Sequence, residues 1–85
     1  IPRVFSFNQE GRLCMNPVEE ASSLLTKEDS HVQLGKWLCK VTDGQNILFE
    51  CPVKDVQDVK ILRDTHTCEV FLNGGETVCT FYFEP

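Results

Sequence analysis

The chain has 85 residues, with thirteen acidic against eight basic side chains and a formal net charge of −5. This length is typical of one small domain, residues 1–85, and the scattered lysines and arginines argue against a protein that grips a nucleic-acid backbone. Because the sequence has neither a long apolar run nor a CxxC pair, we expect no membrane span, no zinc site and no cofactor.

Five cysteines, at positions 14, 39, 51, 68 and 79, are many for so short a chain. Such a count is typical of secreted domains that use disulfides to support a small core. We therefore expect a secreted protein in which Ile1 is a processed end. The odd number leaves at least one thiol outside a bridge.

The N-terminal stretch "RVFSFNQEGRLCM" predicts two strands joined by the turn "NQEG". In the following "NPVEEASSLLTKED" the apolar residues change to helical spacing. Asn16 is a favourable N-cap, Pro17 suits the first helical position and Glu19 completes a capping box. These features predict a helix that ends near residues 27–29.

The segment "KWLCKVTDGQNILFECPV" predicts a hairpin centred on Gln45. This register sets Lys40 opposite Glu50, so that opposite charges meet on one face of the hairpin. It also sets Cys39 opposite Cys51. Directly opposed residues are close enough for a disulfide, and we expect Cys39 and Cys51 to form one. The alternative is that both are buried thiols.

A loop at 54–58 and a strand from Val59 are expected to lead to the last hairpin, "TCEVFLNGGETVCTFYFEP". Asn73 and Gly74 give the strongest short-range hairpin signal, and a two-residue turn there sets Cys68 opposite Cys79. One face of this hairpin collects side chains for a core: Cys68, Val70, Leu72, Cys79, Phe81 and Phe83. The other face holds Glu69, Glu76, Thr80 and Tyr82, with Phe71 and Val78 among them.

This order of elements predicts an α+β domain, in which one helix packs on a twisted antiparallel sheet with an N-terminal β-hairpin. A small β-sandwich is the alternative. Five aromatic side chains could stack on nucleic-acid bases: Phe5, Phe7, Trp37, Phe71 and Tyr82. In so small a domain, however, most of them are needed in the core.

A metal-independent ribonuclease needs a general acid, a general base and a cation. Glu50, Arg63, His66 and His31 are the candidates of the right type. Arg63 and His66 point to opposite faces of a strand, and His31 would have to approach from the next strand. We therefore expect no RNA cleavage, and any RNA binding to be weak and salt-dependent.

The order of elements, with "VEEASSLL", "FECPVKD" and "VCTFYFEP", resembles the RNase-like secreted effectors of powdery mildew fungi. The resemblance implies a ribonuclease-like fold without catalytic residues and delivery into the host cell. It also implies that the protein binds a host plant protein, and that a nucleotide-binding leucine-rich-repeat immune receptor is one such partner. Cys79 matches the family's C-terminal cysteine, and its disulfide partner is then Cys14 or Cys68. The first strand, "FSFN", lacks the family's aromatic-x-Cys motif.

A second group, the β-sandwich effectors of blast fungi, also has a terminal cysteine, a VxL strand and an Asn-Gly-like turn, which "CEVFLNG" resembles. An active ribonuclease and a secreted inhibitor or toxin are further alternatives. For an effector that acts through its surface, five positions are expected to contact the partner: Glu69, Glu76, Thr80, Asp43 and Gln45.

Overall fold

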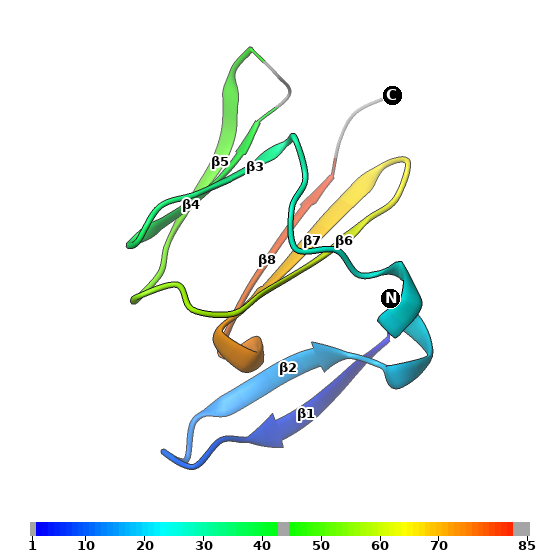
Figure 1. The fold of residues 1–85 in the computed structure, drawn as a ribbon, viewed down its shortest axis with the longest axis vertical. Helices are drawn as coiled ribbons and strands as arrows, with labels where there is room; N and C mark the ends of the chain where they lie inside the picture. Colours follow the sequence, from blue (N-terminus) through cyan, green and yellow to red (C-terminus); the bar gives the residue numbers. More distant parts are fainter. Residues whose placement is uncertain (1, 43–44, 83–85) are drawn as a thin grey trace.

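The computed structural model describes residues 2–42 and 45–82, and over these residues the chain consists mainly of antiparallel strands. The described strands form a two-stranded sheet, β1-β2, and two three-stranded sheets, β3-β4-β5 and β6-β7-β8 (Figure 1). In chain order the elements are β1 (Arg3–Phe7), β2 (Leu13–Pro17), the 3-10 helix η1 (Glu19–Leu24), β3 (Val32–Leu34), β4 (Leu38–Thr42), β5 (Ile47–Pro52), β6 (Val59–Arg63), β7 (Thr67–Leu72), the 3-10 helix η2 (Asn73–Gly75) and β8 (Thr77–Tyr82).

The expected α-helix is absent from the described residues, so the α+β, ribonuclease-like prediction is wrong and the small β-sandwich alternative fits. Asn16 and Pro17, expected to start the helix, instead end β2, where they pair with Val4 and Arg3. Asn16 Nδ2 donates a hydrogen bond to the carbonyl of Gly74 at 2.8 Å. The Asn16 side chain, which was predicted to cap the helix, thus makes a tertiary contact instead.

Backbone hydrogen bonds fix the chain before and after η1, so the segment between them is too short for a longer helix. The N–H of Val18 donates to the carbonyl of Pro2 at 3.2 Å, which extends the β1-β2 pairing. Downstream, Thr26 and Ile61 exchange backbone hydrogen bonds at 2.9 and 2.7 Å, which fixes the chain beside β6. The six residues Glu19–Leu24 form only a short helix between these points, and such a helix gains little stability of its own.

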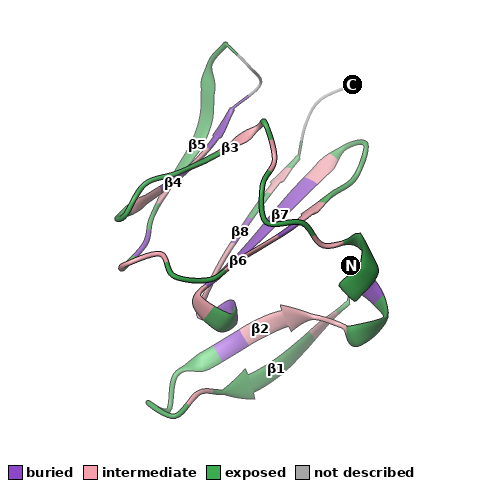
Figure 2. Cartoon of the chain, in the orientation of Figure 1, coloured by how far each residue is buried: buried purple, intermediate pink, exposed green. Residues whose placement is uncertain are grey.

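The sheets β3-β4-β5 and β6-β7-β8 pack face to face and form a small sandwich. The buried side chains between them come from both sheets and from the residue that follows β5: Cys39, Val53, Ile61, Cys68, Val70, Leu72 and Cys79. Val32, Cys51, Val56 and Val59 pack against this cluster. Figure 2 shows buried positions along β7, the middle strand of its sheet. Burial of apolar side chains on the two inner faces stabilises the pair of short sheets.

The β4-β5 hairpin has the predicted register over residues 38–41, and the register then shifts by one residue between Val41 and Thr42. Cys39 lies opposite Cys51 and Lys40 lies opposite Glu50. The predicted burial of Trp37 is wrong, because its side chain is 57% exposed just before β4, with Lys36 Nζ 5.5 Å from the ring centroid. The pairing of charged and thiol side chains therefore predicted the register, but it did not predict where the covered face ends.

The β7-β8 hairpin forms, but its register differs from the predicted one by two residues. Cys68 lies opposite Phe81 rather than Cys79, and Leu72 lies opposite Thr77. Since the shift is even, Cys68 and Cys79 both face the sandwich core as predicted. Glu76 lies in the turn instead of on a strand face, and Phe83 lies outside the described residues.

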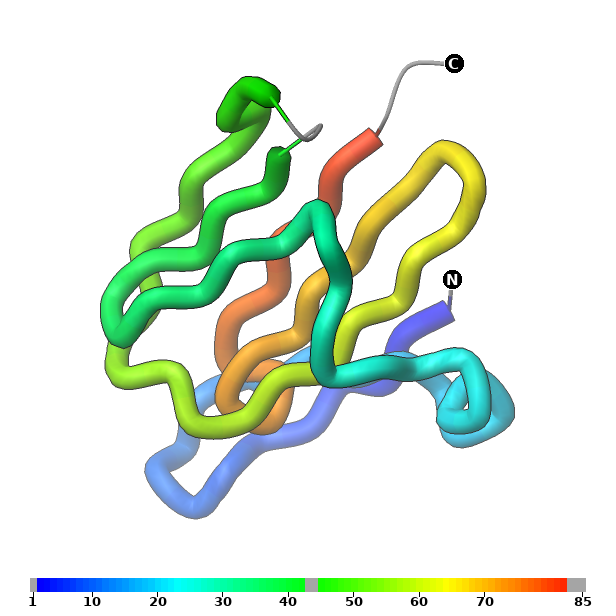
Figure 3. The backbone as a smooth tube through the Cα atoms, turned by 45° about the horizontal axis from the view of Figure 1, so that its top comes forward, coloured from blue at the N-terminus to red at the C-terminus, as the bar shows by residue number. Residues whose placement is uncertain are grey.

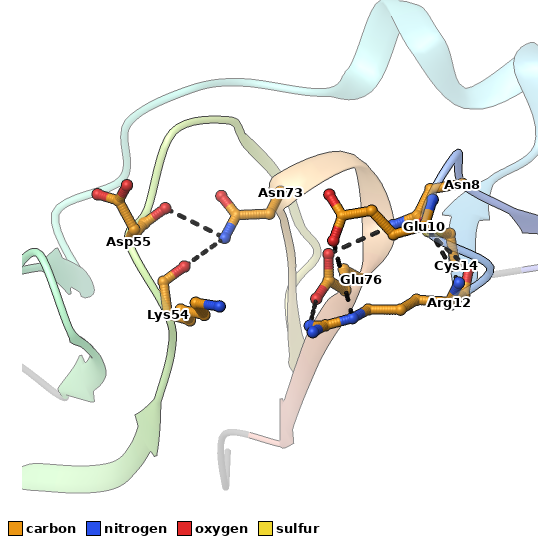
Figure 4. Close-up of polar contacts among 8 residues, drawn as sticks. All are labelled: Asn8, Glu10, Arg12, Cys14, Lys54, Asp55, Asn73 and Glu76. Carbon is orange, nitrogen blue, oxygen red and sulfur yellow. Dashed lines mark hydrogen bonds and ion pairs between the residues drawn. The ribbon is translucent and has the colours of Figure 1, made fainter.

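Contacts of Asn73 account for the longer turn, which runs over residues 73–76. Asn73 has a positive φ of 54°, and Gly74 after it has a φ of 69°. The Asn73 side chain accepts a hydrogen bond from the N–H of Gln57 at 2.8 Å. It also donates one to the Lys54 carbonyl at 2.8 Å (Figure 4). The loop at 54–58 thus holds Asn73 in place, and a tight two-residue turn does not form.

The β1-β2 hairpin lies against the β6-β7-β8 sheet, away from β3-β5 (Figure 3). Phe71, which faces away from the sandwich core, is fully buried, and the Arg3 guanidinium lies 5.5 Å from its ring centroid. Arg3 Nη2 also donates to Glu69 Oε1 at 2.8 Å. Gly75 lies so close to β2 that a Cβ atom there would meet the Met15 carbonyl. The hairpin is therefore a third layer on the sandwich.

Candidate functional site

Arg63, at the end of β6, contacts His31 and Asp29 from the segment that leads into β3. Arg63 Nη1 lies 2.6 Å from His31 Nδ1 and 3.2 Å from Asp29 Oδ1. Asp29 Oδ1 is also 3.4 Å from His31 Nδ1. The fold thus brings a predicted arginine and a predicted histidine together, with a carboxylate that offsets the guanidinium charge.

The other two ribonuclease candidates lie in other parts of the molecule. Glu50 is on β5, opposite Lys40, and His66 is exposed in the connection between β6 and β7. Catalysis at a phosphate needs an acid and a base on either side of preorganised positive charge. Among the described residues, the four candidates do not form this arrangement.

An open depression of about 580 Å³ lies next to the Arg63 cluster. Its lining residues are Lys27, Glu28, Asp29, Ser30, Val32, Leu34 and Ile61. The lining has one lysine against two carboxylates, so it has no excess positive charge with which to attract a polyanion.

The interaction residues expected on β7 and in the turn after it differ in exposure. Glu69 is only 6% exposed, because the third layer covers its face of the sheet, so its prediction as a surface residue is wrong. Glu76 is half-buried and its Oε1 lies 2.5 Å from Arg12 Nη1, an ion pair between the turn and the N-terminal hairpin (Figure 4).

The other three expected interaction residues are Thr80, Gln45 and Asp43. Thr80 and Gln45 are exposed, and Thr80 Oγ1 accepts a hydrogen bond from Arg3 at 2.7 Å. Asp43 lies outside the described residues. The predicted interaction positions therefore do not form one continuous exposed surface.

Three large apolar side chains are instead exposed together on the N-terminal hairpin. Phe5, Phe7 and Leu13 are 65%, 73% and 50% exposed. In the register of β1 and β2, Phe7 lies opposite Leu13 and Phe5 opposite Met15, so all three exposed side chains share one face. We call Phe5, Phe7 and Leu13 the hairpin face. The sequence predicted Phe5 and Phe7 mainly as core residues, and the structure corrects this.

The outer edge of β1 adds backbone groups to this surface. β1 pairs with β2 on one side, and no other strand in the described part of the chain pairs with it (Figure 1). An edge of this kind presents N–H and C=O groups that can pair with another strand. The hairpin therefore combines exposed aromatic side chains with an available strand edge.

The five cysteines are present as thiols in the structure. Cys14 is buried on the N-terminal hairpin, where its Sγ is 3.7 Å from the Arg12 carbonyl, and it is not part of the core cluster that contains Cys79. Cys68 is diagonal to Cys79 across the ladder. Diagonal Cα atoms lie about 7 to 8 Å apart, which is longer than a disulfide usually spans. The geometry favours neither of the partners predicted for Cys79.

Comparisons of the chain with family models, with curated proteins and with solved structures found no match. Over residues 2–42 and 45–82, no three His, Cys, Asp or Glu side chains are grouped so as to hold a metal ion. None of the described helices has the length and apolar character needed to cross a bilayer.

Proposed function

We propose that the protein is a secreted, non-catalytic binding protein of the β-sandwich effector kind, which binds a host plant protein through its N-terminal hairpin. The ribonuclease-like fold implied by the powdery mildew resemblance is not part of this proposal, because the helix that it required is not formed. The secreted effector role rests on the cysteine count and on the resemblance of "CEVFLNG" to blast-fungus effectors.

The hairpin face is the observation that carries the proposal. Phe5 and Phe7 are more than half exposed, next to Leu13 on the same face. Grouped apolar side chains on a small protein are typical of binding surfaces, and buried aromatic anchors dominate the energy of many protein interfaces.

The free edge of β1 favours a partner that adds a strand. In such a complex the partner's backbone pairs with the edge of β1, while its side chains contact Phe5 and Phe7. Backbone pairing supplies affinity, and the aromatic contacts supply selectivity. The expected partner is therefore a host protein that presents an extended segment with apolar side chains.

A binding role also agrees with the charges around Arg63. Asp29 holds the Arg63 guanidinium, and the net charge of −5 opposes the approach of RNA. Delivery into the host cell and recognition by an immune receptor stay predictions of the resemblance. A test of catalysis is incubation of the purified chain with RNA beside an Arg63→Ala, His31→Ala double variant. Cleavage that disappears in the variant would contradict a non-catalytic role.

The binding proposal is tested in leaf tissue with the chain fused to a proximity-labelling enzyme. A Phe5→Ser, Phe7→Ser variant should lose the labelling of a host protein that the parent labels. A matched control, Leu24→Ser with Tyr82→Ser, removes two apolar side chains that are 63% and 72% exposed on other elements, and it should label that protein as the parent does.

The labelled host protein is then purified and its binding to the same three chains is measured by calorimetry. Loss of at least about tenfold in affinity for the hairpin variant alone would support the proposal. Equal labelling and equal affinity for all three chains would contradict it. Sedimentation of the parent alone separates host binding from self-association, and a dimer that the Phe5→Ser, Phe7→Ser change dissociates would also overturn the proposal.

A further inference from the structure

The ladder between β1 and β2 identifies the residues whose backbone groups point to β2. The N–H of Asn8 donates to the carbonyl of Arg12 at 3.0 Å, just beyond one end of the ladder. The N–H of Val18 donates to the carbonyl of Pro2 at 3.2 Å, just beyond the other end. In the continued register both are opposed pairs. Because hydrogen-bonded pairs alternate along an antiparallel ladder, the even-numbered residues of β1 direct their N–H and C=O groups to β2.

The odd-numbered residues Arg3, Phe5 and Phe7 therefore direct their N–H and C=O groups to the outer edge of β1, which no strand of the described residues covers. Pro17, which lies opposite Arg3 and has no N–H, agrees with this assignment. Phe5 and Phe7 thus offer exposed side chains and outward backbone groups together. A strand that pairs with this edge has residues directly opposite them.

The two arginines of the hairpin are engaged by carboxylates. Arg3 bonds to Glu69 at 2.8 Å. Arg12 lies 2.5 Å from Glu76 and 4.0 Å from Glu10, so that one guanidinium contacts two carboxylates. The positive charges of the hairpin are therefore offset within the molecule.

Carboxylates also lie near both ends of β1. Glu10 is exposed in the turn that follows the strand. Glu19 and Glu20 are exposed at the start of η1, directly after the hydrogen bond between Val18 and Pro2. The surroundings of the free edge therefore carry negative charge and favour a cationic partner.

A second copy of the chain meets repulsion at this edge. Antiparallel pairing of two β1 strands places the turn of each copy near η1 of the other, so that Glu10 of one copy lies toward Glu19 and Glu20 of the other. Like charges that oppose each other across a ladder destabilise the pairing. The charges therefore favour a different protein as the occupant.

We infer that the partner segment is a cationic strand with apolar residues at alternate positions, which pairs antiparallel with β1. Two of its residues, i and i+2, lie opposite Phe7 and Phe5, since opposed residues share a face. Their side chains contact the two rings, and their own N–H and C=O groups bond to β1. Lysine or arginine residues at its two ends meet Glu10 at one end and η1 at the other. This inference rests on the proposed binding function and specifies the partner's chemistry.

The first test measures the binding of labelled heptapeptides to the purified 85-residue chain by fluorescence anisotropy. The probe acetyl-KTITITK-amide has alternate isoleucines and terminal lysines. Two comparison peptides change one feature each: KTTIITK places the isoleucines side by side, and ETITITE reverses the charge. We expect the probe to bind at least about tenfold more tightly than either. Equal affinities, or no binding of the probe at a chain concentration of about 1 mM, would overturn the inference.

Backbone methylation of the probe tests the pairing. N-methylation of both isoleucines removes the N–H groups that bond to β1, and it should weaken binding at least about tenfold. N-methylation of the first two threonines is the matched control, because their N–H groups point away from β1, and it should change the affinity by less than about twofold. Equal losses would contradict the inferred pairing.

Charge variants of the chain test the cationic ends of the segment. The Glu10→Gln, Glu19→Gln, Glu20→Gln variant should bind the probe at least about threefold more weakly. A matched control, Glu28→Gln with Glu50→Gln and Asp64→Asn, removes the same charge at exposed positions of other elements and should keep the parent affinity. Equal losses in the two variants would show an effect of net charge alone and would contradict contacts at the ends of β1.

The outcomes separate this inference from the proposed function. Labelling of a host protein that requires Phe5 and Phe7, together with equal binding of the three heptapeptides, would overturn only the inferred chemistry. Sedimentation of the chain at the assay concentration should show a monomer. A dimer that the Phe5→Ser, Phe7→Ser change dissociates would assign the edge to a second copy and overturn both.

Discussion

The β-sandwich and the N-terminal hairpin differ in where their apolar side chains lie. In the sandwich, Val70 and Leu72 on β7 are fully buried between the sheets. In the hairpin, Phe5 and Phe7 point to solvent. The sandwich is therefore stabilised by apolar burial, whereas the hairpin leaves much of its apolar surface available.

Several polar contacts attach the hairpin to the rest of the molecule. Arg3 bonds to Glu69 at 2.8 Å, and Arg12 to Glu76 at 2.5 Å. Asn16 adds a hydrogen bond to the carbonyl of the turn that joins β7 and β8. This contrast indicates that a few directional polar contacts can hold a small hairpin on a domain while its aromatic side chains stay exposed. Four substitutions test this difference.

The largest effect is expected for Phe71→Ala, because Phe71 is fully buried between β7 and the third layer. Loss of its ring leaves a cavity and should lower the free energy of unfolding by about 3 to 5 kcal/mol. The matched control, Phe7→Ala, removes the same side chain at a 73% exposed position, and it should change stability by less than about 0.5 kcal/mol. Urea denaturation measures both. Equal losses would show that the hairpin face is buried in solution.

A second contrast compares two glycines with positive φ. Gly75, at φ +90°, lies against β2, where a Cβ atom would come within 2.6 Å of Asn16 Nδ2, whereas Gly11, at φ +78°, has open space around it. We expect Gly75→Ala to cost about 2 to 3 kcal/mol through backbone strain and overpacking. Gly11→Ala should cost about 1 kcal/mol, from its backbone conformation alone. Thermal or urea unfolding of the two variants would contradict the close packing if they lost equal stability.

A smaller loss is expected when the hairpin loses its main polar anchor. Arg3→Met leaves the Glu69 carboxylate, whose side chain is 9% exposed, without its guanidinium, and should cost about 1 to 2 kcal/mol. Hydrogen exchange should show the loss of protection first in β1 and β2. Adding Glu69→Gln to Arg3→Met should recover part of the stability, because a buried amide is less costly than a buried carboxylate. No recovery would contradict the attribution to charge.

The smallest change is expected for Arg12→Gln. The Arg12–Glu76 ion pair is accessible to solvent, although its hydrogen bond raises the pKa of Arg12. Exposed pairs of this kind contribute little, so the urea midpoint should stay within the error of the parent. A clear loss of stability would show that Arg12, and not Arg3, is the main anchor of the hairpin.

Local patterns predicted several parts of this fold. The opposed charges of Lys40 and Glu50, together with the apolar and cysteine pairs beside them, predicted the β4-β5 register over residues 38–41, because that pairing depends on residues close in the sequence. The alternation along β7 predicted that Val70 and Leu72 face a core. The same alternation separated Glu69 from them, but it did not show that another layer covers the second face.

Of the candidate sites, the sequence supplied the residue types but not their grouping. Phe5 and Phe7 were recognised as strand residues, yet period-two spacing does not say which face of a hairpin stays uncovered. Arg63 and His31 are 32 positions apart, and they meet only because the segment before β3 runs beside the end of β6. Cys39 from β4 and Cys79 from β8 likewise share one buried cluster only because the two sheets face each other.

The hairpins and the side chains on each strand face could be derived from the amino-acid sequence, because turn residues and the period of two specify both. The other features of the fold depend on contacts between segments that are distant in the sequence. The end of β2 and the short 3-10 helix η1 replace the predicted α-helix, since the Asn16 side chain bonds to the Gly74 carbonyl instead of capping a helix. The register between β7 and β8 differs by two residues from the predicted one, since the 54–58 loop holds Asn73 in place. In each case a hydrogen bond to a distant segment outweighed a local preference, and local preferences are weak compared with such contacts.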